Sequence, residues 1–194
     1  MSLKEEEQQL VADALKGVPY AWESLVRRYE GRVYNFGLRL TGNETDAMDL
    51  MQEVFMGVYK NLHRFRSESM FSTWLFRIAH NKAVDLARKS KSGLTRSLSD
   101  MEGEDAVPDN EAMIAPAQEQ PVERLMQKQA NAQVRALLSA LSFESRVIVE
   151  LKVFQSYTFD DIAELQGLSP NTVKTRFYSA IRKLKKLLES DYEL

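Results

Sequence analysis

Residues 158–188 read TFDDIAELQGLSPNTVKTRFYSAIRKLKKLL, and this stretch decides the fold of the C-terminal part of the chain. Thr158, with Asp161 three residues later, predicts a variant of the capping box at the start of a short helix. Gly167 is a natural end for that helix. Ser169 and Pro170 then start a second helix, because serine caps helices and proline suits their first position. Two helices joined by about three residues indicate a helix-turn-helix motif.

The second helix of this motif is strongly basic, with six basic residues and no acidic one between residues 171 and 186. Helical spacing predicts a buried stripe made of Val173, Phe177, Ala180, Ile181, Leu184 and Leu188. The exposed positions near its start carry side chains that can reach base edges and phosphates in a DNA major groove. These positions are Asn171, Thr172, Lys174, Thr175, Tyr178 and Ser179. At this point a plain helical hairpin with a solvated basic face remains the alternative.

The N-terminal part of the chain also predicts helices. Residues 46–62, DAMDLMQEVFMGVYKNL, place their apolar side chains on one helical stripe and Asp49, Gln52 and Glu53 on another. Residues 70–91 predict a further helix, with Arg77, Asn81, Asp85 and Arg88 away from its apolar face. No period-2 alternation predicts a strand, so we expect an all-α protein.

The segment from Lys60 to Lys91 carries eight basic and two acidic residues. Phe71 and Trp74 lie within it, and basic side chains close to aromatic rings suit single-stranded nucleic acid. Most of the surface of these two rings is nevertheless expected to pack in the core.

A strongly acidic segment separates the two basic parts of the chain. Residues 96–123 contain one basic and eight acidic residues, a net charge of −7, and three of the five prolines. Such a composition buries too little apolar surface to offset the entropy lost on ordering. We therefore expect a flexible acidic linker at 91–121 between two small helical domains, 1–90 and 122–194. The net charge of −2 for the whole chain does not argue against nucleic-acid binding by either end.

Composition excludes several functional classes. The 194 residues are 44% hydrophobic and 28% charged, as in folded proteins, and contain no cysteine. Disulfides, thiolate catalysis and cysteine-ligated zinc are thereby excluded. His63 and His80 have no evident ligand partners, so we expect no catalytic residue, no metal and no cofactor. There is no apolar run long enough to span a membrane and no signal core, which predicts a cytoplasmic protein without direct membrane insertion.

Four blocks resemble, in order, the small extracytoplasmic-function (ECF) group of bacterial RNA polymerase sigma factors, group IV of the sigma-70 family. The blocks are AWESLVRRYEGRVYNFGLRLTGN (21–43), DAMDLMQEVFMGVY (46–59), FRSESMFSTWLFRIAHNKAVDLAR (65–88) and FDDIAELQGLSPNTVKTRFYSAIRKL (159–184). The resemblance covers nearly the whole chain. It implies sigma domain 2 at 1–90 and sigma domain 4 at 122–194, with no room for a domain 3.

The resemblance also implies roles for individual residues. The residues that would dock on the β′ clamp helices of core RNA polymerase are Asp46, Asp49, Gln52 and Glu53. The residues that would melt and read the −10 element are Arg66, Ser67, Glu68, Ser69, Met70, Trp74, Arg77, Asn81, Lys82 and Arg88. The loop 67–70, with Asn81 on the helix beneath it, would capture a flipped base. The residues that would read the −35 element are Asn171, Thr172, Lys174, Thr175, Tyr178 and Ser179, while Arg176 and Arg182 would contact phosphates.

The implied function is that of a dissociable, non-enzymatic specificity subunit. It would bind core RNA polymerase through the β′ clamp helices and the β flap, read a two-part promoter and help to open it. An anti-sigma protein is the implied regulatory partner. An autonomous helix-turn-helix regulator would explain residues 155–190 but not the basic segment 60–91. A nucleic-acid enzyme would need a metal or nucleophile site, and Asp46, Asp49 and Glu53 form the only close acidic cluster. Co-elution with core polymerase would separate these alternatives.

Overall fold

The computed structural model describes residues 3–67, 69–94 and 132–191, and every regular element in these ranges is a helix. The predicted all-α fold in two helical regions is therefore confirmed. We call residues 3–94 the N-terminal half and residues 132–191 the C-terminal half. Most of the predicted linker lies outside the described residues, except that 91–94 belong to the end of helix α4 (Phe71–Leu94).

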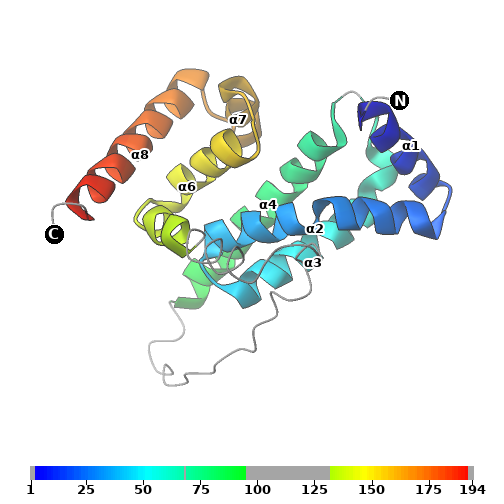
Figure 1. The fold of residues 1–194 in the computed structure, drawn as a ribbon, viewed down its shortest axis with the longest axis horizontal. Coiled ribbons are helices and arrows are strands. Elements are labelled where there is room, and N and C mark those ends of the chain that lie inside the picture. Colours follow the sequence, from blue (N-terminus) through cyan, green and yellow to red (C-terminus); the bar gives the residue numbers. More distant parts are fainter. Residues whose placement is uncertain (1–2, 68, 95–131, 192–194) are drawn as a thin grey trace, which may run out of the picture.

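The N-terminal half is built around helix α2 (Pro19–Thr41), which packs against α1 (Leu3–Leu15), α3 (Glu44–Asn61) and α4 (Figure 1). Helix α2 ends at Gly42, whose φ of 74° is left-handed and favours glycine. Asn43 then caps α3 by accepting a hydrogen bond from the Asp46 amide at 3.1 Å. A short 3₁₀ turn, η1 (Leu62–Arg64), leads into the loop before α4.

Helices α2 and α3 approach each other closely at Gly37. A Cβ atom at this position would lie 3.1 Å from the Cα atom and 3.2 Å from the carbonyl oxygen of Ala47, which are both backbone atoms. Glycine is therefore needed at this position for α3 to pack closely against α2. The position of α3, with its acidic outer face, depends on this contact.

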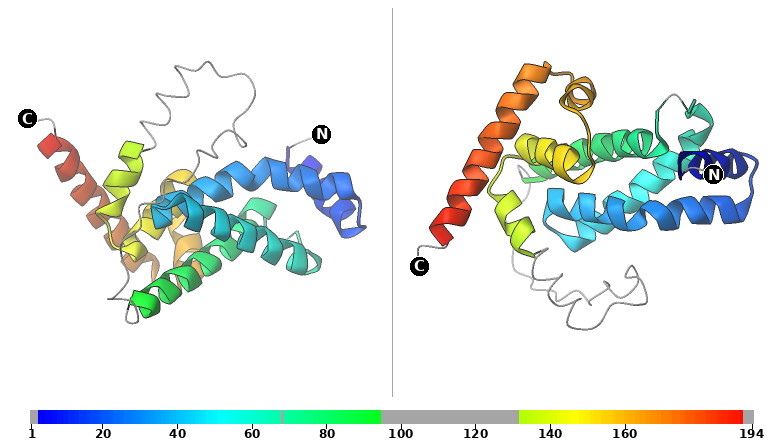
Figure 2. Two further views of the ribbon diagram at one scale, coloured as in Figure 1. Left: turned by 90° about the horizontal axis from the view of Figure 1, so that it is seen from below. Right: turned by 45° about the horizontal axis from the view of Figure 1, so that its top comes forward.

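The C-terminal half begins with a helical segment at 132–139, followed by α6 (Phe143–Val149) and a π-helical turn, η3 (Glu150–Phe154). Helices α7 (Phe159–Gln166) and α8 (Pro170–Asp191) complete it. Helix α8 packs on α6 and α7 and runs along the outer edge of the molecule (Figures 1 and 2).

The two halves share one apolar core. Leu40, Leu75 and Ala79 of the N-terminal half belong to the same buried cluster as Ile148 and Leu151 of the C-terminal half. Both views in Figure 2 show α6 and α7 lying between α8 and the N-terminal helices. In the ranges that the structure describes, no helix combines the length and apolar character needed to cross a membrane.

Candidate nucleic-acid interface

The acidic face of α3 is exposed. Asp46, Asp49, Gln52 and Glu53 all lie on the outer surface, while Ala47, Leu50, Val54 and Val58 of the same helix are buried. Glu53 accepts a hydrogen bond from Lys82 Nζ of α4 at 2.6 Å. This hydrogen bond, together with the positive charge of Lys82, lowers the pKa of Glu53 below its usual value. The expected acidic face is thus linked directly to a residue expected to contact DNA.

A groove of about 560 Å³ lies between α3 and α4. Its lining contains Asp49, Gln52 and Glu53 from α3 together with Lys82 and Arg88 from α4. The structure therefore brings three of the four residues predicted to bind polymerase onto one surface with two of the residues predicted to read the −10 element, which we call the −10 set.

The loop before α4 holds four described residues of the −10 set: Arg66, Ser67, Ser69 and Met70 are all exposed. Glu68 lies outside the described residues. Ser67 has a φ of 58°, a left-handed conformation that is uncommon for residues other than glycine. Strained backbone of this kind is concentrated at functional sites. Met70 leaves 53% of its surface exposed although it is apolar.

Arg77, Asn81 and Arg88 of helix α4 are all exposed, on the side of the helix that faces the C-terminal half. Trp74 is half-buried, and its ring packs 5.5 Å from Phe65 and 5.9 Å from Phe71, centroid to centroid. Trp74 is thus anchored in the core with one part left accessible. His80 is buried, and this burial lowers its pKa.

The structure does not place Asn81 beneath the loop as expected. Asn81 follows Phe71 by ten residues, which corresponds to about 15 Å along a helix. Ser69 and Met70 line a small depression with Glu7 and Phe65, whereas Asn81 lines a different groove beside the C-terminal half. Helical periodicity correctly predicted that Asn81 lies away from the apolar face of the helix. It did not predict how far along the helix axis Asn81 lies from the loop.

The helix-turn-helix forms as its capping residues predict. Thr158 Oγ1 accepts a hydrogen bond from the Asp161 amide at 3.1 Å, and the Asp161 carboxylate accepts one from the Thr158 amide at 2.9 Å. Gly167 ends α7 with a left-handed φ of 64°. Ser169 Oγ accepts from the Thr172 amide at 3.1 Å and caps α8. Ala163, expected to be small at the helix crossing, is buried.

The residues predicted to read the −35 element, which we call the −35 set, lie on α8 and are largely exposed, and two of them lie beside α7: Lys174 Nζ and the Tyr178 ring are 6.0 and 6.2 Å from the ring centroid of Phe159. Asn171, Lys174, Thr175, Arg176, Tyr178, Ser179 and Arg182 are exposed, and Thr172 is half-buried. The buried stripe is narrower than predicted: Val173 and Ala180 are buried, but Ile181 and Leu188 are 37% and 41% exposed. The prediction was wrong for these two residues because α6 and α7 do not cover that side of the helix, so spacing alone overestimated the buried width.

A set of polar contacts between the two halves was not predicted from the sequence. Arg39 of α2 pairs with Glu150, and Arg77 of α4 pairs with Glu164 of α7. A signal for the first pair is present in RVIVELKVF (146–154), where one acidic residue interrupts an apolar run. A buried acid of this kind needs a cationic partner.

Comparison with known proteins identifies the class. Residues 25–93 match the family model for sigma-70 region 2, and residues 131–184 match the model for sigma-70 region 4. The chain therefore belongs to the sigma-70 family of transcription factors.

Individual relatives place it more closely. The chain is 29% identical to the RNA polymerase sigma-H factor of Pseudomonas aeruginosa, over 97% of each chain. It is 27% identical to the ECF RNA polymerase sigma factor SigW of Bacillus subtilis, over 89% of this chain and 91% of SigW. Within the sigma-70 family, the chain is a factor of the ECF type, group IV.

Two solved structures share the fold. One is the structure of CnrH in complex with the cytosolic domain of CnrY, with a TM-score of 0.63 and 27% identity over 95% of this chain and 98% of that chain. The other is the sigma factor RpoE in complex with the anti-sigma factor NepR from Bartonella quintana, with a TM-score of 0.64 and 21% identity over 87% of this chain and 97% of that chain.

The protein is accordingly a promoter-directing sigma factor that binds core RNA polymerase and promoter DNA. Sigma factors are non-enzymatic initiation factors. An autonomous helix-turn-helix regulator, the alternative left open by the sequence, is not favoured.

Proposed function

We propose that the three exposed residue sets divide the work of transcription initiation. The acidic face of α3 binds the β′ clamp helices, the exposed polar side chains of α4 with the loop 66–70 read the −10 element, and α8 reads the −35 element. One observation carries the proposal: these side chains project from three helices whose opposite faces are packed in the core. Each helix can therefore present its set without giving up its own packing.

The chain supplies no catalytic group in this proposal, and the polymerase carries the chemistry of RNA synthesis. Its place of action is the cytoplasm, where core polymerase and promoter DNA are found. An anti-sigma protein is the proposed regulator. Support comes from the similar fold of RpoE, which was solved with the anti-sigma factor NepR.

A contact with the β flap is proposed for the later turns of α8. Ile181 and Leu188 are apolar and partly exposed there, on a helix whose other exposed side chains are mostly polar. Apolar residues left at a surface are candidates for burial against a partner.

Reconstitution with a bacterial core RNA polymerase tests the proposal. The purified chain should co-elute with core polymerase and direct transcription from a promoter selected from a random library. Core polymerase alone should not start at that promoter. A chain that binds DNA but never associates with core polymerase would contradict the proposal.

The acidic face of α3 can be tested separately. Asp49→Arg with Gln52→Arg changes the net charge of the face Asp46, Asp49, Gln52 and Glu53 from −3 to 0 and leaves the Glu53–Lys82 ion pair intact. We expect at least a tenfold loss of affinity for core polymerase, because the charge-assisted contact of Asp49 would be lost and two arginines would face a basic clamp. Glu23→Arg, which reverses an exposed acid on α2, is the matched control and should bind normally. Equal affinity of a folded double variant and this control would refute the assignment.

A further inference from the structure

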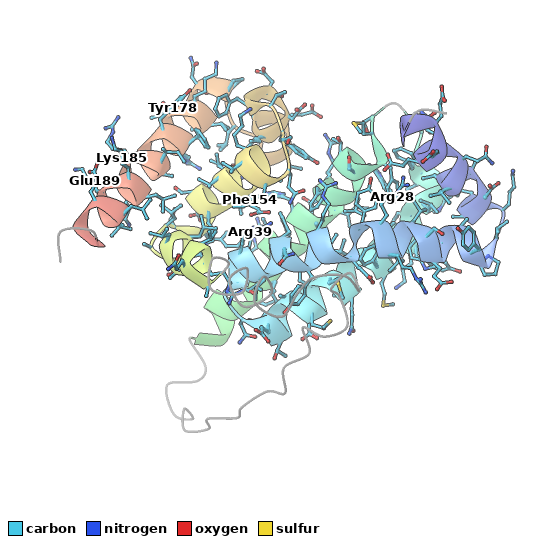
Figure 3. The ribbon with its side chains drawn as sticks, in the orientation of Figure 1. Arg28, Arg39, Phe154, Tyr178, Lys185 and Glu189 are labelled. Atoms are coloured by element: carbon cyan, nitrogen blue, oxygen red, sulfur yellow. The ribbon has the colours of Figure 1, made fainter. Side chains whose placement is uncertain are left out.

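The contact between the two halves is centred on a buried ion pair. The Glu150 side chain has no exposed surface, and that of Arg39 is 15% exposed. Arg39 donates through Nε and Nη2 to the two carboxylate oxygens of Glu150, at 2.5 and 2.8 Å. The Arg39 guanidinium also lies 4.0 Å from the ring centroid of Phe154, beside which it is seen in Figure 3. A two-pronged pair of this kind is strong and fixes orientation as well as distance.

The residues around Glu150 also tie its carboxylate to both halves. Glu150 opens the π-helical turn η3, and π-turns inside helices occur frequently at functional sites. Gln155 Nε2 donates to Glu150 Oε1 at 3.1 Å, and Gln155 Oε1 accepts a hydrogen bond from Arg32 Nη2 of α2 at 2.8 Å. The carboxylate is thus satisfied by one residue of its own half and one cation of the other half. Without Arg39, closing the halves would bury an uncompensated charge.

Two further hydrogen bonds join the halves. Arg146 Nη1 donates to the Leu40 carbonyl at the end of α2 at 2.6 Å, and Tyr157 Oη donates to the Thr73 carbonyl of α4 at 2.6 Å. With the shared apolar cluster, these contacts hold the halves in one defined arrangement.

This arrangement brings the two promoter-reading surfaces too close together. Asn81 and Arg88 of the −10 set line a groove of about 770 Å³ together with Arg176 of the −35 set. Arg77 donates to Glu164 of α7 at 2.7 Å and is thereby engaged within the chain. The −10 and −35 elements are separated by roughly 25 base pairs, or about 85 Å of straight duplex at about 3.4 Å per base pair. Residues that line one groove cannot reach both elements.

We propose that the contact between the halves is an autoinhibitory latch, closed by the Arg39–Glu150 ion pair, that opens before the chain reads a two-part promoter. The proposal rests on the promoter-reading surfaces proposed above. Because only the open form can engage both elements, the apparent promoter affinity is reduced by the fraction of chains that are closed. The latch therefore lowers promoter reading by free chains and favours partners that bind the open form.

The latch can be opened and closed again by substitution. Arg39→Met keeps an aliphatic chain over Phe154 but removes the cation, and it should shift the equilibrium towards the open form by about a hundredfold. Arg39→Met with Glu150→Met replaces the pair by two apolar side chains. This double variant should close again, because a buried ion pair can be replaced by apolar residues with little loss.

Closure can be measured without polymerase or DNA. The chain has no cysteine, so Arg27→Cys and Lys185→Cys introduce one dye site in each half. Both native side chains are 74% exposed. Energy transfer between the dyes should fall in Arg39→Met and recover in the double methionine variant, while circular dichroism shows unchanged helix content. Unchanged transfer in a helical Arg39→Met chain would overturn the role of the ion pair.

A reversible bridge tests whether closure is inhibitory. Arg32→Cys and Gln155→Cys, both outside the proposed binding surfaces, can be joined by a short bis-thiosulfonate reagent. The bridged chain should lose at least tenfold in promoter-dependent transcription with core polymerase and recover on reduction. Each single-cysteine variant should be unaffected by the reagent.

Full transcription by the bridged chain would overturn the latch. If the reduced, unbridged chain and the wild type both fail to direct transcription, the proposed function fails and the inhibitory role falls with it. That result is distinguishable from failure of the latch alone, because energy transfer reports closure independently of transcription.

Discussion

Helices α4 and α8 carry the two proposed promoter-reading surfaces, but they are held in place differently. Phe71, Leu75, Phe76, Ala79 and Ala83 of α4 are all buried in the shared core. On α8 the only buried positions among those described are Val173 and Ala180 (Figure 3 shows α8 at the edge). Helix α4 is therefore a central part of the core that also has an exposed face for DNA. Helix α8 is held to the rest of the protein by only a narrow buried stripe. Substitutions should therefore affect stability mainly in α4 and DNA binding mainly in α8.

The largest effect is expected for Phe76→Ala in α4. Phe76 is fully buried, its ring lies 5.5 Å from that of Phe36, and the Arg32 guanidinium lies 5.1 Å from its centroid. Removing the ring should lower the free energy of unfolding by about 3–5 kcal/mol, through lost burial and the cavity that remains. Urea unfolding followed by circular dichroism measures this, and exposed Asp85→Ala on the same helix is the control. A loss below about 1 kcal/mol would show that α4 is not a core element.

Several of the structural features of α3, α7 and α8 could be predicted from the sequence, because they depend on residues close to one another in the chain. Caps at Thr158, Gly167 and Ser169 act within a few residues, so the helix-turn-helix could be located from the sequence alone. The buried stripe of α3 followed from its spacing. The Arg39–Glu150 pair could not be predicted in the same way, because its partners are 111 residues apart and local patterns carry no information on such pairing. The exposure of Ile181 likewise depends on which helices cover α8.

The second prediction concerns Lys174 on α8, an exposed residue whose Nζ lies 6.0 Å from the ring centroid of Phe159. Lys174→Ala should weaken −35 binding by about 1–3 kcal/mol and relax preference at one or two base pairs, because a base-edge contact carries sequence information. Arg182→Ala, two turns later, should weaken binding to all sequences and lower the salt slope by about one unit.

A library of −35 sequences, selected by holoenzyme containing each variant at two salt concentrations, distinguishes these roles. Unfolding curves of both variants should match the wild type, because exposed residues of α8 contribute little to stability, unlike the buried residues of α4. If Lys174→Ala changes only the salt slope, this residue contacts phosphate and our placement of α8 in the groove is wrong.

The third prediction concerns Thr158, which caps α7 in the C-terminal half. Thr158→Ala removes the hydroxyl that accepts from the Asp161 amide and should cost about 1 kcal/mol of stability. Thr158→Ser keeps the hydroxyl and should retain most of it. Hydrogen exchange should show faster opening at the start of α7 in the alanine variant and no change in α2. A uniform change across both halves would mean that the cap affects the whole fold rather than α7 alone.

The smallest effect is expected for Ile181→Ala on α8, and it tests how narrow the attachment of that helix is. Ile181 is 37% exposed, so truncating it removes apolar surface that is already partly in water and should change stability by less than about 0.5 kcal/mol. Val173→Ala on the same helix is the matched comparison. Val173 is fully buried, and two lost methyl groups at about 0.8 kcal/mol each, with the cavity they leave, should cost about 2 kcal/mol. Similar losses for the two variants in urea unfolding would mean that α8 is packed over a wider face, and the contrast with α4 would then disappear.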